Sequence, residues 1–180
     1  MAPLRTVIVF ISALTLISCA EKKHDGTTHD GKLKESLLQQ LKNSNSDENW
    51  FAPINVAVTG VTAAQASWKD TTENHSIGQL ASHLAFWNER VLKSFQGNKP
   101  PDFQGSNDST FKQLNDSEWA AIQTRLDSIQ KLIEQTVSGA SDEQLLEWAP
   151  TINNLCMHNA YHTGQMVYIR KRNGWWRPHS

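Results

Sequence analysis

Two histidines late in the chain have a spacing that suits metal binding. His158 and His162 lie four residues apart. In an α-helix this separation amounts to about 40° of rotation and about 6 Å of rise, so both imidazoles leave the same face. Such a pair can supply two nitrogen ligands to one metal ion. A third imidazole would give a three-nitrogen site with open coordination, the arrangement that catalytic metals use.

A third histidine, His83, has a comparable position on an earlier predicted helix. It lies beside Leu80 and Trp87 at the edge of the apolar stripe of that helix, and His158 and His162 lie at the edge of theirs. Edge positions face the grooves between helices, where helical bundles build metal sites. Each histidine alone is better explained as an ordinary buried or surface residue. The three together leave two interpretations open, a metal site or a bundle without metal in which the rings point apart.

Polar side chains flank the histidine pair. Tyr161, Asn159 and Gln165 could carry protons, and Gln165 could instead orient one of the histidine rings. We take Tyr161 and Gln165 as the candidate catalytic residues. No carboxylate stands at a fixed spacing to act as a general base, since Glu89 is predicted on the solvent side of its helix. Cys156 falls on the apolar stripe and is predicted to be a buried, unreactive thiol.

Four long helices would position these residues. Apolar residues recur in them at spacings of three and four, and no segment shows the sustained alternation of a strand. The helices are predicted from Lys32 to about Asn43, from Ser76 to about Gly97, from Asp116 to Gly139 and from Thr151 to about Arg172. Capping boxes at Thr62–Gln65 and Ser141–Gln144 predict two short helical segments, the second of them broken at Pro150. The expected fold class is all-α, a four-helix bundle with short extra helical turns.

The composition fits one small domain. The chain has 180 residues, 17 Lys and Arg against 18 Asp and Glu, and a formal net charge of −1. This length suffices for one compact core but not for two domains and a linker. Because there is no excess of positive charge to neutralise phosphates, we expect no nucleic-acid partner. The two cysteines are too few for a disulfide scaffold.

The beginning of the chain is typical of an export signal. Arg5 precedes an uninterrupted run of apolar and small residues from Val7 to Ile17, which has the length of a signal-peptide core and is too short to span a bilayer. The run ends in Leu16-Ile17-Ser18-Cys19, which resembles the bacterial lipobox, where the cysteine becomes lipidated. The alternative is an ordinary signal peptide with a cysteine near its cleavage site.

These features divide the chain into four parts. Residues 1–18 would be a lipoprotein signal peptide, 19–31 the lipidated Cys19 with a polar tether, 32–176 the bundle and 177–180 a tail. The protein is then expected to be exported and held at the cell envelope by acyl chains. In a cell with two membranes we expect the periplasmic side of the outer membrane, because Ala20 and not Asp follows the cysteine.

Two stretches of the chain resemble the DinB/YfiT-like superfamily. They are His75-Ser-Ile-Gly-Gln-Leu-Ala-Ser-His-Leu-Ala-Phe-Trp-Asn-Glu-Arg90 and His158-Asn-Ala-Tyr-His-Thr-Gly-Gln165. A His-x-x-x-His-x-Gly-Gln element late in the last helix, paired with His-Leu in the middle of the second, is typical of that superfamily. The resemblance extends over about Lys32 to Trp176.

The resemblance implies a bundle in which His83, His158 and His162 hold a divalent metal, with water in the open position. It also implies a homodimer and either metal-dependent hydrolysis or thiol-dependent transfer. The metal would be Zn²⁺ or Ni²⁺, which three imidazoles do not discriminate well. Because the thiols used by such relatives are cytoplasmic, hydrolysis of an extracytoplasmic small molecule is the first choice here and thiol transfer the second. The alternative from another class is a non-catalytic, metal-containing binding lipoprotein.

Overall fold

The computed structural model describes residues 27–176, and within this range it contains helices, turns and loops but no strand. The predicted signal peptide, Cys19 and the tail 177–180 lie outside the described residues. The helices are α1 (Thr27–Asn45), α2 (Ile54–Val58), α3 (Ala63–Ser67), α4 (Ile77–Phe95), the 3₁₀ helix η1 (Asn107–Thr110), α5 (Asp116–Gly139) and α6 (Asp142–Arg172). No helix among these residues is long and apolar enough to cross a membrane.

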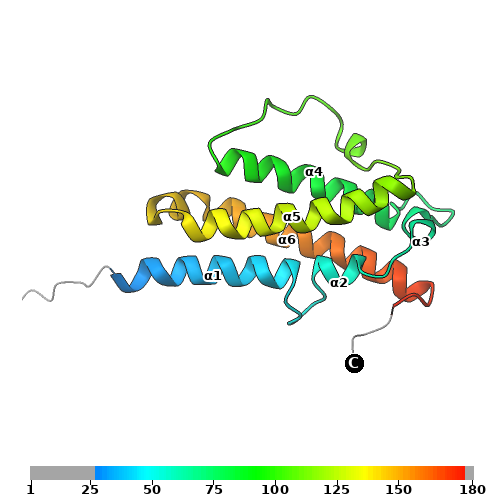
Figure 1. The fold of residues 1–180 in the computed structure, drawn as a ribbon, viewed down its shortest axis with the longest axis horizontal. Helices are drawn as coiled ribbons and strands as arrows, with labels where there is room; N and C mark the ends of the chain where they lie inside the picture. The colour runs from blue at the N-terminus through cyan, green and yellow to red at the C-terminus, as the bar shows by residue number, and fades with distance from the viewer. Residues whose placement is uncertain (1–26, 177–180) are drawn as a thin grey trace, which may run out of the picture.

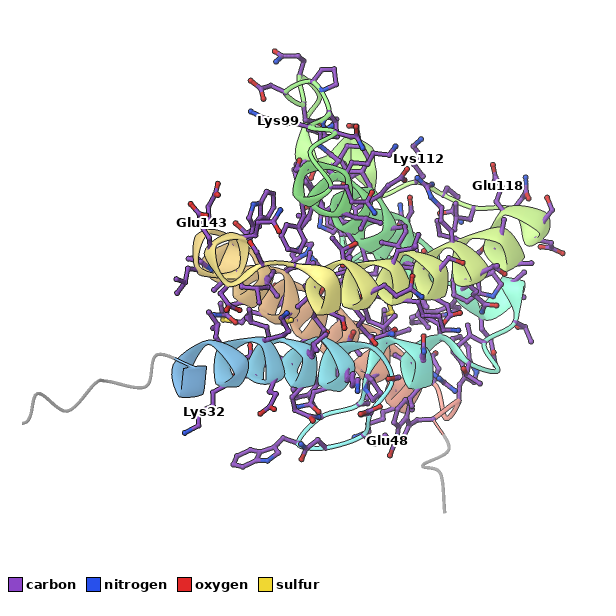
Figure 2. The ribbon with its side chains drawn as sticks, turned by 60° about the vertical axis from the view of Figure 1, so that its left-hand side comes forward. Lys32, Glu48, Lys99, Lys112, Glu118 and Glu143 are labelled. Atoms are coloured by element: carbon purple, nitrogen blue, oxygen red, sulfur yellow. The ribbon has the colours of Figure 1, made fainter. Side chains whose placement is uncertain are left out.

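The four long helices lie side by side and form the predicted all-α bundle (Figure 1). Helix α4 packs against α5 and α6, and α1 packs against the same two helices from the other side. Their apolar stripes meet in one core. Fully buried side chains of this core include Leu37 and Leu41 of α1, Leu80 and Leu84 of α4, Leu126 and Ile133 of α5, and Ile152 and Met166 of α6. The charged side chains labelled in Figure 2, among them Lys32, Glu118 and Glu143, lie on the outside of the bundle.

Capping boxes set the beginnings of four helices. In each, the side chain of the residue before the helix accepts a hydrogen bond from the backbone N–H three positions on, and the side chain at that third position accepts one from the backbone N–H of the residue before the helix. The pairs are Thr62 with Gln65, Ser76 with Gln79, Asn115 with Glu118, and Ser141 with Gln144. Each cap is worth about 1 kcal/mol. The boxes at Thr62 and Ser141 are the two that the sequence predicted, and the structure confirms both.

The last helix corrects the prediction of a break at Pro150. Helix α6 runs unbroken from Asp142 to Arg172, with this proline inside it. Pro150 lacks the N–H that would bond the carbonyl of Leu146, but both residues are exposed, so water can take that bond. Leu145 and Ile152 are buried on either side of the proline. Their packing against the bundle therefore keeps both segments in one helix.

The first helix is longer than its apolar spacing suggested. Helix α1 begins at Thr27, whereas the sequence predicted a start near Lys32 and a polar tether before it. The first apolar residue of the stripe, Leu33, lies more than a turn after Thr27, so the sequence at the beginning of α1 contains no apolar residue. Hydrophobic periodicity could not have located this end of the helix.

Three buried amides link α4, α5 and α6. Asn88 Nδ2 donates to Asn159 Oδ1 at 2.8 Å and to the carbonyl of Leu84 at 2.7 Å. Asn88 Oδ1 accepts from Gln130 Nε2 at 2.8 Å and from Asn159 Nδ2 at 3.0 Å. All three side chains have an exposed fraction of 0%. This network fixes the register of the helices that carry the histidines. A shift of α4, α5 or α6 along its axis would leave buried amide atoms without hydrogen-bond partners.

Candidate metal centre

Three histidines converge where α4 packs against α6. His83 lies in the middle of α4, and His158 and His162 lie in the second half of α6. Their candidate ligand nitrogens all lie within 4.8 Å of one another, and His83 Nε2 is 3.0 Å from His158 Nε2. The sequence analysis left open whether the rings converge or point apart, and the structure shows that they converge.

The Nδ1 atoms of two of the histidine rings are held by hydrogen bonds to side-chain oxygen atoms. His83 Nδ1 lies 2.6 Å from Thr110 Oγ1, and this hydroxyl itself donates to the carbonyl of Asn107 at 2.6 Å. His162 Nδ1 lies 2.7 Å from Gln165 Oε1. Because both oxygens accept here, each Nδ1 carries the proton and each Nε2 keeps its lone pair. The two rings are therefore fixed in orientation and in the tautomer that can bind a metal through Nε2.

Burial keeps the three imidazoles neutral at neutral pH. Burial first, and the neighbouring histidines second, lower the pKa of His83 to about 3 and that of His158 to about 4. Burial also lowers the pKa of His162, against the opposing effect of its hydrogen bond with Gln165. Neutral imidazole is the form that binds metal ions.

The donor set fits a divalent transition metal. Imidazole nitrogens suit Zn²⁺ and Ni²⁺, and four tetrahedral ligands at about 2.0–2.1 Å from a metal lie about 3.4 Å apart. The nitrogens of this cluster are compatible with that separation, since His83 Nε2 and His158 Nε2 lie 3.0 Å apart and all three lie within 4.8 Å of one another. Among residues 27–176, no fourth His, Cys, Asp or Glu joins the group. The described residues therefore offer three ligands and leave further coordination open.

A cleft of about 580 Å³ gives access to the histidines. Its remaining walls are apolar or neutral: Trp87, Val91, Asn107, Phe111, Thr151, Asn154, Leu155 and Tyr161. No charged side chain is among them. A small molecule in this cleft would meet the ring nitrogens on one side and aromatic or amide groups on the others.

The sequence of the bundle matches a known protein family. A family model described as the DinB superfamily matches residues 52–166, which is more than half of the chain and includes His83, His158 and His162. The chain belongs to the DinB superfamily. No curated protein matches it, and no solved structure does. The DinB superfamily match supports the three-histidine cluster as a metal site, and it leaves the metal and the reaction unnamed.

Phe111 is part of this DinB-superfamily site, and the sequence analysis missed it. Its ring is stacked between His83, at 3.9 Å between centroids, and His75, at 3.7 Å. It thereby holds the plane of the His83 ring. Phe111 follows η1 in an irregular segment, where no periodicity marks a functional position. His75 precedes α4 and does not join the metal-ligand group.

The three polar residues that flank the histidine pair in the sequence, Tyr161, Gln165 and Asn159, have different surroundings in the structure. Tyr161 is 64% exposed at the rim of the cleft, with its ring centroid 5.0 Å from that of His162. Gln165 contacts His162 Nδ1 and therefore orients that ring. Asn159 is withdrawn into the buried amide network and is wrongly placed for proton transfer.

Two further groups lie apart from the histidines. Glu89 forms ion pairs with Lys93 and Arg125 and does not line the cleft. Cys156 is buried, and burial raises the pKa of its thiol to about 11. A thiol with this pKa stays protonated at neutral pH, so it is the unreactive thiol that the sequence predicted.

Proposed function

We propose that this chain is a metal-dependent hydrolase acting on a small molecule outside the cytoplasm. His83, His158 and His162 would hold Zn²⁺ or Ni²⁺. The observation that carries the proposal is the open cleft over three neutral imidazoles, with no fourth protein ligand among the described residues. A divalent ion with neutral ligands keeps its full charge and supplies a Lewis acid that makes water, or a thiol, nucleophilic at neutral pH.

The surrounding residues have separate roles in this proposal. Thr110 and Gln165 hold two imidazoles by their Nδ1 atoms, so the ligand nitrogens are already oriented in the free protein. Trp87 and Leu155 line the cleft with apolar surface and limit the water around a bound substrate. Tyr161 lines the cleft and would donate its hydroxyl proton to a substrate oxygen. Gln165 is a positioning residue, and Tyr161 remains the candidate catalytic residue.

The open cleft also bears on the rival function, a non-catalytic binding lipoprotein. A structural metal is normally closed in by four protein ligands, whereas a catalytic one keeps a position for water or substrate. The described residues supply three ligands and a cleft that reaches them. This arrangement favours catalysis.

The proposal is tested with a panel of small esters, amides and thioesters. We expect turnover that EDTA abolishes, that Zn²⁺ or Ni²⁺ restores and that is absent from the His158→Ala/His162→Ala variant. The control is Asn98→Ala, because this exposed residue lies outside the cleft and should leave turnover unchanged. A metal-loaded protein that turns over no member of the panel, with or without added thiols, would support the binding lipoprotein.

Gln165→Leu is expected to weaken metal binding about 10- to 100-fold, because His162 loses the acceptor that fixes its ring and tautomer. Gln165→Glu keeps an acceptor oxygen and should retain most of the affinity. The dissociation constant is measured by competition with a chromophoric chelator. Gln135→Leu is the matched control, since Gln135 is exposed on α5. Equal affinity in the Gln165→Leu and Gln135→Leu variants would remove Gln165 from the site.

We further propose that Cys19 carries a lipid anchor at the cell envelope. The lipobox-like sequence supports this, although it lies outside the described residues. Cys19→Ala is expected to abolish acylation, and phase partitioning in a detergent that clouds on warming measures the change. The wild-type chain should enter the detergent phase. If it instead stays in the aqueous phase after its signal peptide is removed, the ordinary signal peptide is the correct interpretation.

A further inference from the structure

A second cavity lies beside the histidine cleft. It has a volume of about 330 Å³, within the range of sites that hold small molecules. It lies between the last turns of α6 and the segment that joins α3 to α4. Tyr161 lines both hollows, and Gln165, which orients His162, also faces this cavity. A ligand here would therefore adjoin the candidate metal centre.

Much of the cavity wall is apolar or aromatic. Trp68, Leu80, Tyr168 and Ile169 contribute to it. Trp68 is itself supported from behind by Trp175, whose ring packs edge-on against it at 5.8 Å between centroids. Such a wall can bury the flat or apolar body of a ligand, and the Trp68 ring is already held in place by Trp175.

The charges of the cavity leave one cation uncompensated. Arg172 Nη1 lies 2.6 Å from Asp70 Oδ2, so these two charges balance each other. Hydrogen bonds from Thr72, and then the contact with Arg172, lower the pKa of Asp70, which is therefore ionised at neutral pH. Lys69 also lines the cavity and forms no ion pair with any residue of the range 27–176. The cavity thus carries a net positive charge.

His75 adds a polar atom that lacks a partner. Its Nδ1 is buried and forms no hydrogen bond within the described structure. Buried polar atoms without partners are uncommon in folded proteins, and this one belongs to a residue of the cavity wall. Its ring is held against Phe111, which in turn contacts His83.

We propose that this cavity binds the distal part of the substrate, a carboxylate or similar anionic group attached to an aromatic or other flat apolar body. Lys69 would attract the anion, and Trp68 and Tyr168 would enclose the body. The assignment as substrate rests on the proposed hydrolase function and deepens it, because it names a class of substrate. The binding itself requires no metal, so the two proposals can fail separately.

The test is binding of 2-naphthoate and of its uncharged analogue 2-naphthamide to the full chain, measured by isothermal titration calorimetry against a protein-free blank. We expect one site for 2-naphthoate and at least about fivefold weaker binding of 2-naphthamide. Lys69→Gln should weaken the binding of 2-naphthoate about 3- to 10-fold and leave the binding of 2-naphthamide unchanged. Lys69→Arg keeps the charge and should restore most of the binding. Lys32→Gln, on the outside of α1 (Figure 2), is the matched control and should change nothing.

The His158→Ala/His162→Ala variant separates this site from the metal centre. It should bind 2-naphthoate as the wild-type chain does. Loss of binding in this variant would place the ligand at the histidines and overturn the proposal. Equal affinity for the two probes, no binding of either, or no effect of Lys69→Gln would overturn it as well.

Discussion

The purified chain is expected to carry about one Zn²⁺ or Ni²⁺ ion, and the His158→Ala/His162→Ala variant none. The variant keeps only His83 of the three ligands, and a single imidazole does not hold a divalent ion against buffer. Elemental analysis of protein purified without a His tag, before and after incubation with each metal, gives the ratio of ion to chain.

The structure supplies a matched control for this experiment in His75. It is a histidine near the same α4–α6 contact, yet it does not join the metal-ligand group. His75→Ala should therefore keep the ion, so a loss confined to the double variant identifies the ligands. Circular dichroism should show the same helix content in all three proteins.

A wild-type chain that takes up neither metal would end the catalytic proposal. The three neutral imidazoles would then be a polar cluster inside a helical bundle, and the function of the protein would have to be sought in binding partners. Metal bound equally by the wild-type chain and the double variant would point to a different site, outside the histidine cluster.

The parts of the fold that follow from local sequence were predictable. The capping boxes at Thr62 and Ser141 and the apolar stripe of α5 depend on residues a few positions apart, so the sequence shows them directly. Pro150 was misjudged because packing on both sides of it outweighs one missing backbone hydrogen bond. That packing involves other helices, which local reasoning does not see.

In the candidate site, too, local sequence predicted some residues and not others. His83, His158 and His162 could be found because they lie on regular helices, where spacing gives direction. Thr110 and Phe111, which hold the His83 ring, come from η1 and the residue after it. The position of an irregular segment depends on what it packs against, so no sequence pattern placed these two residues at the site.

The buried amides had a signal that the sequence analysis did not use. Asn88, Gln130 and Asn159 each occupy a position on the apolar stripe of their helix. Asn88 lies four residues after Leu84 and four before Leu92, both of which are buried. A polar residue at a core position must find a partner, and three of them on three helices indicate that they bond to one another.

Asn88→Ala is expected to lower the free energy of unfolding by about 2–4 kcal/mol. Asn88 is the centre of the network, so its removal leaves buried polar atoms of Gln130 and Asn159 without partners, each at a cost of about 1–3 kcal/mol. Urea denaturation followed by circular dichroism measures the change. Asn98→Ala, at an exposed residue beyond α4, should stay within about 0.5 kcal/mol of wild type. If Asn88→Ala also changes the free energy of unfolding by less than about 0.5 kcal/mol, water or rearranged side chains satisfy the hydrogen bonds of the remaining amides.

The same variant connects the network to the metal centre. Asn159 directly follows His158, and Asn88 lies little more than one turn after His83, so the amides hold together the two helices that carry the ligands. We therefore expect Asn88→Ala to weaken metal affinity as well. Leu126→Ala is the comparison, because it removes a buried side chain from α5, which supplies no ligand. If both variants lose stability but only Asn88→Ala loses metal affinity, the network positions the ligands. Equal losses would mean that affinity merely follows global stability.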